Sequence, residues 1–378
     1  MEYVMLKDVC AINMGQSPDS DSYNDNGDGV PFFQGNADFG ERYPVTRKWC
    51  SAPTKMAAPE DILISVRAPI GAMNYAKEEC CIGRGLAALT PDKTKVSPEF
   101  LFWLLKGKNA ELNSKGTGST FKAIGRKVLE ETMVPDIPLE KQIEYSEALE
   151  KVYDVIQHRK SELQMLDDLI KARFVELFGN ILCDNNLPLV QLSELADIGS
   201  SKRIYANEYV NSGVPFYRSK EIRELGTGLK PSVELFIKQE RYDEIKEKYG
   251  VPKVGDILIA AIGATIGYSW IVDTDNPFYY KDGNLIILSI KDNINPIFLN
   301  HTMGILIEDF KNKGVAGSAQ LALTIEKLEK MMVVNPDIEL QNQFADFVKQ
   351  VDKSKFVVQK SLDEAQLLFD SLMQEYFG

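Results

Sequence analysis

A set of short phrases occurs twice in this 378-residue chain, about 199 residues apart, and this repeat constrains the fold more than any other feature. Asp61–Ile64 (DILI) recurs as Asp256–Ile259, and Gly118-Ser119 recurs as Gly317-Ser318. The offset is 195 at Asp61 and 199 from Leu86 onward, as expected when a few residues are inserted in loops. A repeat of this length can bury its own core, so we predict two tandem domains and not a short-period solenoid.

Each copy ends in a segment that is predicted to form a long helix with a coiled-coil seam. Apolar residues recur at alternating steps of four and three, which indicates a seam sustained for more than four heptads. The first seam consists of Tyr145, Leu149, Val152, Ile156, Arg159, Leu163, Leu166, Ile170, Arg173 and Leu177, and the second of Phe344, Val348, Val351, Lys355, Val358, Leu362, Ala365, Phe369, Leu372 and Tyr376. A long helix packed on its own domain is the alternative interpretation.

The two helices are expected to pair with each other in antiparallel orientation, because the second must run back beside the first. This pairing would relate the two globular domains by pseudo-twofold symmetry and give a spacer of roughly 50 Å, at about 1.5 Å rise per residue. The predicted domains are residues 1–138 and 180–337, and the predicted coiled-coil helices are residues 139–179 and 338–378.

Within the globular domains, short apolar runs alternate with glycine-rich and asparagine-rich loops. Strands are predicted at 30–33, 62–66, 86–89, 214–217, 257–261 and 285–290, and helices at 97–105 and 295–307. Strands and helices do not alternate regularly as they do in a doubly wound sheet, so the fold class is α+β.

Composition excludes several other classes of protein. The five cysteines have no Cys-x-x-Cys spacing and there are only two histidines, so neither a disulfide framework nor a structural metal site is expected. The longest uncharged run, Ile257–Val272, has 16 residues and contains two glycines, which is too short to span a bilayer. We therefore expect a cytoplasmic protein without membrane contact. The net charge of −12 means that DNA binding would depend on local basic faces or on partner subunits.

Several phrases occur in the same order in both halves and point to a known family. They are Val30-Pro31-Phe32-Phe33 with Val214-Pro215-Phe216-Tyr217, Glu60–Arg67 followed by Ile70-Gly71, Gly83-Arg84-Gly85-Leu86-Ala87, Gly118–Phe121, Val134-Pro135, and Pro138–Gln142 at the start of the helix. Over the whole chain, this series resembles the specificity (S) subunit of type I restriction–modification enzymes. The second copy departs from it, because Ile262-Gly263 stands where Arg67 is expected and Gly283-Asn284 replaces Arg84-Gly85.

The resemblance implies two tandem target recognition domains of α/β structure, joined by the two helices, that together read a bipartite, asymmetric site in double-stranded DNA. It also implies two methyltransferase (M) subunits, which would methylate adenine at N6, and restriction (R) subunits, which would supply the nuclease. This chain would then be a non-catalytic subunit without a cofactor of its own, while S-adenosylmethionine, ATP and Mg²⁺ would be bound by the partner subunits.

Locally basic loops are the predicted DNA-binding segments, because lysine and arginine neutralise phosphates while arginine, lysine, asparagine and glutamine can read base edges. The candidate DNA-binding residues are Gln34, Asn36, Arg47, Lys48, Arg67, Lys115, Ser119, Lys122, Arg218, Lys220, Lys281, Lys313, Ser318 and Gln320. The candidate partner-binding residues of the helices are Leu149, Ile156, Arg159, Leu163, Ile170, Val351, Lys355, Val358, Leu362 and Phe369.

Two other functions are compatible with parts of the sequence. A stand-alone adenine methyltransferase or nuclease with built-in recognition repeats would need a cofactor site. Asn276-Pro277-Phe278-Tyr279 is close to the adenine-binding motif of N6-adenine methyltransferases but lacks its second proline, and no glycine-rich signature for S-adenosylmethionine precedes it. A coiled-coil adaptor protein without a role in DNA binding is the other alternative.

Overall fold

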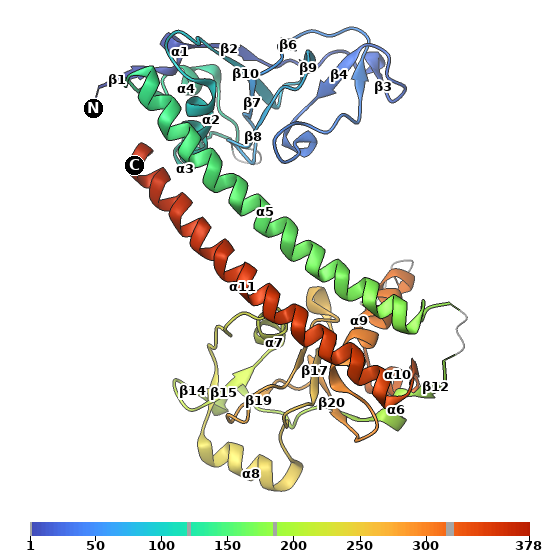
Figure 1. The fold of residues 1–378 in the computed structure, drawn as a ribbon. Helices are drawn as coiled ribbons and strands as arrows, with labels where there is room; N and C mark the ends of the chain where they lie inside the picture. The colour runs from blue at the N-terminus through green and yellow to red at the C-terminus, as the bar shows by residue number, and fades with distance from the viewer. Residues whose placement is uncertain (1, 119–121, 184–186, 315–320) are drawn as a thin grey trace. The chain divides into compact units, whose positions relative to one another are not determined.

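The computed structural model describes residues 2–118, 122–183, 187–314 and 321–378, which fall into two compact units. Unit 1 consists of residues 1–161 and 358–378, and unit 2 consists of residues 162–357. Each unit combines a globular body with a part of both long helices, α5 (Leu139–Phe178) and α11 (Ile338–Phe377) (Figure 1).

Unit 1 contains two main sheets and a small one. Its strands are β1 (Tyr3–Met5), β2 (Cys10–Met14), β3 (Tyr23–Asn24), β4 (Val30–Phe33), β5 (Trp49–Cys50), β6 (Met56–Ala57), β7 (Ile62–Ser65), β8 (Met73–Tyr75), β9 (Cys80–Ile82), β10 (Leu86–Pro91) and β11 (Met133–Pro135). The strand orders are β2-β10-β7-β8, β3-β5-β4-β9-β6 and β1-β11. Its shorter helices are α1 (Leu6–Val9), α2 (Pro98–Gly107), α3 (Asn109–Ser114) and α4 (Arg126–Glu130), with 3-10 turns at Ser20–Ser22 and Asn36–Asp38.

Unit 2 repeats this plan of two main sheets and a small one, but its second main sheet has four strands where that of unit 1 has five. Its strands are β12 (Leu189–Gln191), β13 (Ala196–Gly199), β14 (Tyr209–Val210), β15 (Val214–Tyr217), β16 (Phe236–Ile237), β17 (Ile257–Ala260), β18 (Ser269–Ile271), β19 (Tyr279–Tyr280), β20 (Leu285–Ile290) and β21 (Met332–Val334). The strand orders are β13-β20-β17-β18, β14-β16-β15-β19 and β12-β21. Its shorter helices are α6 (Leu192–Leu195), α7 (Ser219–Gly226), α8 (Gln239–Tyr249), α9 (Pro296–Gly314) and α10 (Ile325–Glu329), with 3-10 turns at Ala206–Glu208 and Gly263–Thr265.

The predicted strands and helices are confirmed, and their apolar runs are explained by burial on two sides. In β7, Ile62 and Ile64 contribute to the core under α2, while Leu63 contributes to a second cluster on the opposite face. In β17, Ile257 and Ile259 face one cluster and Leu258 faces another. Because alternate side chains of a strand point to opposite faces, a strand covered on both faces can be apolar at successive positions.

The two long helices pair in antiparallel orientation within each unit, as predicted. In unit 1, Tyr145 of α5 stacks on Tyr376 of α11 with ring centroids 4.0 Å apart, and Arg159 Nε donates a 3.2 Å hydrogen bond to Ser361 Oγ. In unit 2, Phe174 lies 5.3 Å from Phe344 between ring centroids. The pseudo-twofold relation and the length of the spacer stay predictions.

In unit 2, the helix pair and the globular body enclose a cavity of about 530 Å³ lined by His301 of α9. Burial and, to a smaller extent, the nearby Lys355 ammonium lower the pKa of His301 to about 4, while Asp167 opposes the shift. Burial also raises the pKa of the Asp352 carboxyl, which lines the same cavity. Phe102 holds the position of His301 in the first copy, at the offset of 199 residues.

Unit 2 is therefore expected to lose stability as the pH falls from about 6.5 to about 4. The unfolded histidine takes up a proton in this window while the folded one stays neutral, so the free energy of unfolding falls by up to about 1.4 kcal/mol per pH unit, or roughly 3 kcal/mol in total. His301→Phe should remove this part of the pH dependence. Urea unfolding followed by the fluorescence of Trp270, the tryptophan of unit 2, measures it.

His158 lies in unit 1, so His158→Gln serves as the matched control and should leave the pH dependence of the unit 2 transition unchanged. Equal slopes for the wild-type chain and His301→Phe between pH 6.5 and 4 would contradict the assignment to His301.

Candidate nucleic-acid interface

A row of main-chain hydrogen bonds brings the predicted DNA-binding residues of unit 1 together at one edge of the fold. Gly85 N–H donates to Gln34 O (3.2 Å), Val66 N–H to Gly85 O (2.9 Å), and Ile124 N–H to Val66 O (2.9 Å). The row joins the ends of β4 and β7, the turn before β10, and the segment that precedes α4. We call the exposed side chains of Gln34, Arg67, Arg84 and Lys122 along this row the rim of unit 1.

Arg84 was not among the predicted DNA-binding residues, although it stands at the centre of the rim. The signal in the sequence is the pair of glycines around it. A Cβ at Gly85 would overlap with the main-chain oxygen of Gln34, so only glycine lets the two segments approach closely enough for their hydrogen bond. The Gly83-Arg84-Gly85 phrase thus presents an exposed arginine on a tightly fixed turn.

The rim of unit 1 is electropositive. Arg67, Arg84 and Lys122 are exposed, and none of them has an ion pair within the part of the chain that the structure describes. Ala68 N–H donates to Lys122 O (3.0 Å), which holds the segments of Arg67 and Lys122 side by side. Unpaired exposed cations of this kind are available to phosphate groups.

The other predicted residues of unit 1 flank this row. Arg47 Nη1 donates to Ala37 O (3.1 Å) beside the turn that contains Asn36, and Lys48 O accepts from Phe32 N–H (2.9 Å). Lys115 ends α3 and forms an exposed ion pair with Glu111. Ser119 lies outside the described residues.

Unit 2 repeats two of the three hydrogen bonds of the row and one bond beside it. Ala261 N–H donates to Asn284 O (2.9 Å) and Leu323 N–H donates to Ala261 O (2.9 Å), which correspond to the bonds of Val66 and Ile124 in unit 1. Lys281 N–H donates to Tyr217 O (2.9 Å), as Gly83 N–H donates to Phe33 O (2.8 Å). The sequence repeat is therefore also a repeat of this edge, and we call the side chains of Arg218, Lys281, Ile262 and Asn284 the rim of unit 2.

The charges near this second rim are mostly neutralised. Arg218 Nη2 donates to Glu221 Oε1 and to Glu234 Oε2, both at 2.9 Å, and Lys220 Nζ donates to Glu234 Oε1 (2.8 Å). The hydrogen bonds from Lys220 and Arg218 lower the pKa of the Glu234 carboxyl to about 2. Lys313 pairs with Asp309 (2.7 Å) on α9, and Lys281 has no ion pair among the described residues. Ser318 and Gln320 lie outside the described residues.

Glu221→Gln is expected to lower the free energy of unfolding of unit 2 by about 2 kcal/mol. Glu221 is fully buried and accepts hydrogen bonds from both the main-chain N–H (2.8 Å) and the guanidinium of Arg218, and hydrogen bonds to charged groups contribute about 1.5–3 kcal/mol. Urea unfolding followed by Trp270 fluorescence measures the change. Glu247→Gln, at an exposed position of α8, is the control and should change it by less than about 0.5 kcal/mol. A loss at Glu221 as small as this would show that the ion pair is not structural.

The predicted partner-binding residues of the helices pack largely inside the chain. Leu149, Ile156, Leu362 and Phe369 belong to the core of unit 1 or pack on it, and Ile170 and Val351 belong to that of unit 2. Val358 is buried, Leu163 is half-buried, Arg159 donates to Ser361, and Lys355 Nζ lies 2.6 Å from Asp167 Oδ1. The seam holds the two helices together, and a role of these side chains in partner binding stays a prediction.

Other apolar side chains of the helices are exposed. In unit 1 they are Ile143, Val155, Leu367 and Leu368, and in unit 2 they are Met165, Leu169, Val175, Phe356 and Val357. Phe356 and Leu367 each leave 73% of their surface in solvent. Heptad periodicity finds the buried seam, whereas these outward positions follow no simple period.

No group of three or more His, Cys, Asp or Glu side chains that could hold a metal ion occurs among the residues that the structure describes. Within the same residues, no helix has both the length and the apolar character needed to cross a bilayer.

Comparison with known proteins decides the family. The family model described as the type I restriction modification DNA specificity domain matches residues 1–165 and 187–365. The chain belongs to this family. The two matches to the specificity domain begin close to the start of each repeat and each extends into one of the long helices, α5 or α11.

Relatives within the specificity family are found in archaea and bacteria. A candidate type I restriction enzyme MjaX specificity subunit of Methanocaldococcus jannaschii is 44% identical over 156 residues, which are 41% of this chain and 37% of that protein. A candidate specificity subunit of Haemophilus influenzae is 29% identical over 50% of this chain and 45% of that protein. The match thus spans less than half the length of either relative. The MjaVIII specificity subunit of Methanocaldococcus jannaschii is 25% identical over 72% of this chain and 68% of that protein.

Solved structures support the same fold. The S subunit of a type I restriction-modification system from M. genitalium aligns with 100% of this chain and 96% of its own, with a TM-score of 0.64 and 15% identity. A chain from a structure of a type I R-M system aligns over 100% and 97%, with a TM-score of 0.56 and 17% identity. The α+β fold with two repeated bodies and two long helices is therefore that of S subunits.

Proposed function

We propose that this chain is the DNA-recognition subunit of a type I restriction–modification complex and that it reads a bipartite, asymmetric site in double-stranded DNA. Each unit would read one half of the site, and the two long helices would set the number of unread base pairs between the halves. The observation that carries this proposal is the recurrence of the rim, because corresponding main-chain hydrogen bonds place different side chains at the same edge of both units.

The difference between the two rims suits two readers of different half-sites. Arg67, Arg84 and Lys122 leave unit 1 with cations for phosphate contacts, whereas Arg218 and Lys220 of unit 2 are held by acids. Sequence is read by contacts to base edges, while phosphate contacts fix the register on the duplex. We propose that Gln34, Asn36, Arg47, Lys48, Lys115, Lys281, Lys313, Ser119, Ser318 and Gln320 contribute to one or other of these roles.

Catalysis would reside in partner subunits. We propose that two methyltransferase subunits bind S-adenosylmethionine and methylate adenine at N6 after flipping it out of the duplex, and that restriction subunits with ATP and Mg²⁺ complete the nuclease. The exposed apolar side chains of α5 and α11 are a suitable docking surface for the methyltransferases, since exposed apolar patches on helices commonly mark protein interfaces. The net charge of −12 fits a chain that holds DNA only together with such partners.

Co-expression with a cognate methyltransferase subunit, followed by single-molecule sequencing of methylated host DNA, tests the proposal. We expect N6-methyladenine confined to one bipartite motif and lost when this chain is deleted. Methyladenine that persists without this chain would contradict it, and so would a stable complex that leaves host DNA unmethylated at any bipartite motif. Failure to form a complex with the methyltransferase would instead favour a coiled-coil adaptor.

A further inference from the structure

In unit 1, the strand β6 occupies a slot between β9 and β2, and no strand among the described residues of unit 2 occupies the equivalent slot. In unit 1, β6 pairs antiparallel with β9, with Met56 opposite Cys81, and Ile82 N–H donates to Lys55 O (2.8 Å). Asn13 Nδ2 of β2 donates to Met56 O (2.7 Å) from the other side. The strand β9 therefore lies between β4 and β6, and β6 closes the space between β9 and β2.

In unit 2, helix α8 and the segment after it replace β6, and β19 becomes an edge strand of its sheet. β19 pairs in parallel with β15, and Lys281 N–H donates to Tyr217 O on that side. Because main-chain groups alternate in direction along a strand, the N–H and C=O of Tyr280 point away from β15, as those of Ile82 do in unit 1. Among the described residues, no group accepts from the N–H of Tyr280 or donates to its C=O.

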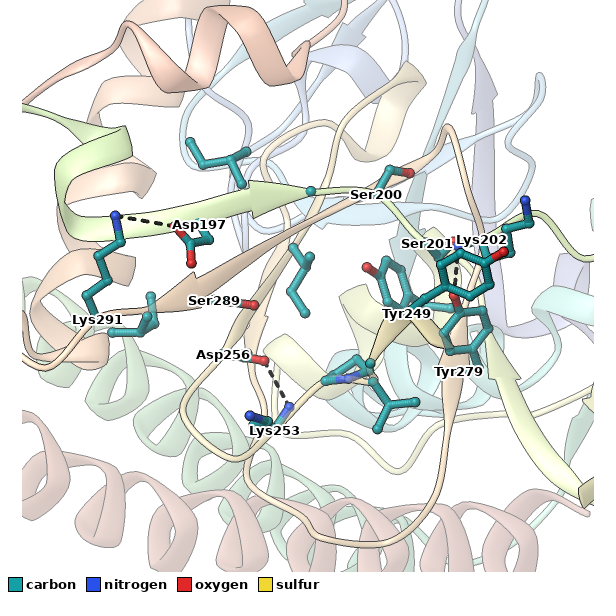
Figure 2. Close-up of a pocket in the computed structure, with 18 residues that line it drawn as sticks. Asp197, Ser200, Ser201, Lys202, Tyr249, Lys253, Asp256, Tyr279, Ser289 and Lys291 are labelled. Carbon is teal, nitrogen blue, oxygen red and sulfur yellow. Dashed lines mark hydrogen bonds and ion pairs between the residues drawn. The ribbon is translucent and has the colours of Figure 1, made fainter. Parts of the chain in front are cut away.

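A cavity of about 700 Å³ lies beside the free edge of β19, between β19 and β13 (Figure 2). Its walls are β13, the loop Ser200–Lys202, the segment Tyr249–Lys253 that follows α8, and the strands β19 and β20. The Oγ of Ser201 is buried there without a hydrogen-bond partner among the described residues. The slot that unit 1 fills with its own strand is thus open in unit 2.

The charge of this cavity is weakly positive. Three lysines and two aspartates line it, and Lys291 is already held by Asp197 (3.3 Å) at one end. Lys202 lies over the ring of Tyr249, with its Nζ 5.3 Å from the ring centroid, and Lys253 has no ion pair among the described residues. Figure 2 shows Lys202 and Lys253 on separate walls of the cavity.

We propose that the cavity binds an extended, acidic peptide segment of another protein, which adds to β19 as the strand that β6 supplies in unit 1. A peptide main chain offers both a donor and an acceptor to the strand edge, as in other cases of β-strand addition, whereas a phosphate group only accepts. Lys202 and Lys253 favour acidic side chains on the segment. This site adjoins the rim of unit 2 at Lys281 but uses none of the rim side chains, and it does not depend on the proposed DNA recognition.

The probe is a capped nine-residue peptide with the sequence of residues 52–60 and the substitution Lys55→Glu, added to the full-length chain. Residue-resolved amide exchange should show at least tenfold slower exchange of the Tyr280 amide when the peptide is present and no change at Ile82. The parent peptide, with lysine at position 55, should bind at least fivefold more weakly. The acidic peptide methylated at the main-chain nitrogen of the residue matching Ala57 should not protect Tyr280.

Variants of the chain test whether the two lysines favour an acidic peptide. The double variant Lys202→Glu with Lys253→Glu should reverse the preference between the two peptides, while Lys248→Glu, on α8 but outside the cavity, should leave it unchanged. Protection of Tyr280 by a short DNA duplex and not by the peptide would overturn the proposal in favour of a nucleic-acid contact. Binding that leaves the exchange of Tyr280 unchanged, or a preference that survives the double variant, would also overturn it.

Discussion

Replacing both Arg67 and Lys122 with glutamate is expected to weaken binding of the chain and its methyltransferase partner to their DNA motif by about 100-fold. Both side chains are exposed on the rim of unit 1 and have no ion pair among the described residues, so the change replaces two available cations with two anions. Each phosphate contact contributes about 0.9 to the slope of log affinity against log salt concentration, so the slope should fall by about 2. Fluorescence anisotropy of a labelled duplex at several salt concentrations measures both quantities.

The matched control keeps the same change of charge away from the rim. Lys93 and Lys127 are exposed and each already pairs with an exposed acid, so Lys93→Glu with Lys127→Glu should change the affinity by less than about threefold. If the control pair lost as much affinity as the rim pair, the effect would belong to the net charge and not to the rim. Unchanged affinity in the rim variant would remove these residues from the interface.

The sequence alone predicts only some of the residues of the two rims. The offset of 199 residues placed equivalent loops in both copies, and the basic residues of the first copy identified Arg67 and Lys122. Arg67 and Lys122 lie on neighbouring segments because Ala68 N–H donates a hydrogen bond to Lys122 O. This bond joins segments 54 residues apart and follows no periodicity. The glycines that flank Arg84 could have indicated its position on a tight turn, because they permit the close approach to Gln34.

Other features required the three-dimensional structure. Glu221 stands three residues after Arg218, where an acid commonly caps the start of a helix, so their pairing could be read from the spacing. The second partner, Glu234, comes from a distant loop and neutralises Lys220 as well. The heptad seams predicted the pairing of α5 with α11 because its period is fixed by helix geometry, but the same pattern could not show which faces stay exposed.

Side chains at equivalent positions of the repeat are packed differently in the cores of the two units. Trp103 of α2 corresponds to Thr302 of α9, and both have a buried polar side-chain atom without a partner among the described residues. In unit 1 the indole fills the space between the globular body and the helix pair. Its ring centroid lies 5.1 Å from that of Tyr153 on α5 and 5.4 Å from that of Phe369 on α11. A sequence offset therefore predicts equivalent backbone positions but not equivalent packing.

Trp103→Ala is accordingly expected to lower the free energy of unfolding of unit 1 by about 3–5 kcal/mol. The side chain is fully buried, and truncation of a buried tryptophan removes its transfer free energy and leaves a cavity. Urea unfolding followed by Trp49 fluorescence reports unit 1, and Trp270 reports unit 2. Tyr43→Ala, at a side chain that is 48% exposed, is the control and should cost less than about 1 kcal/mol. An equal shift of the Trp270 transition would show that the two units unfold as one, and a loss below 1 kcal/mol would mean that Trp103 does not join the helix pair to the body of unit 1.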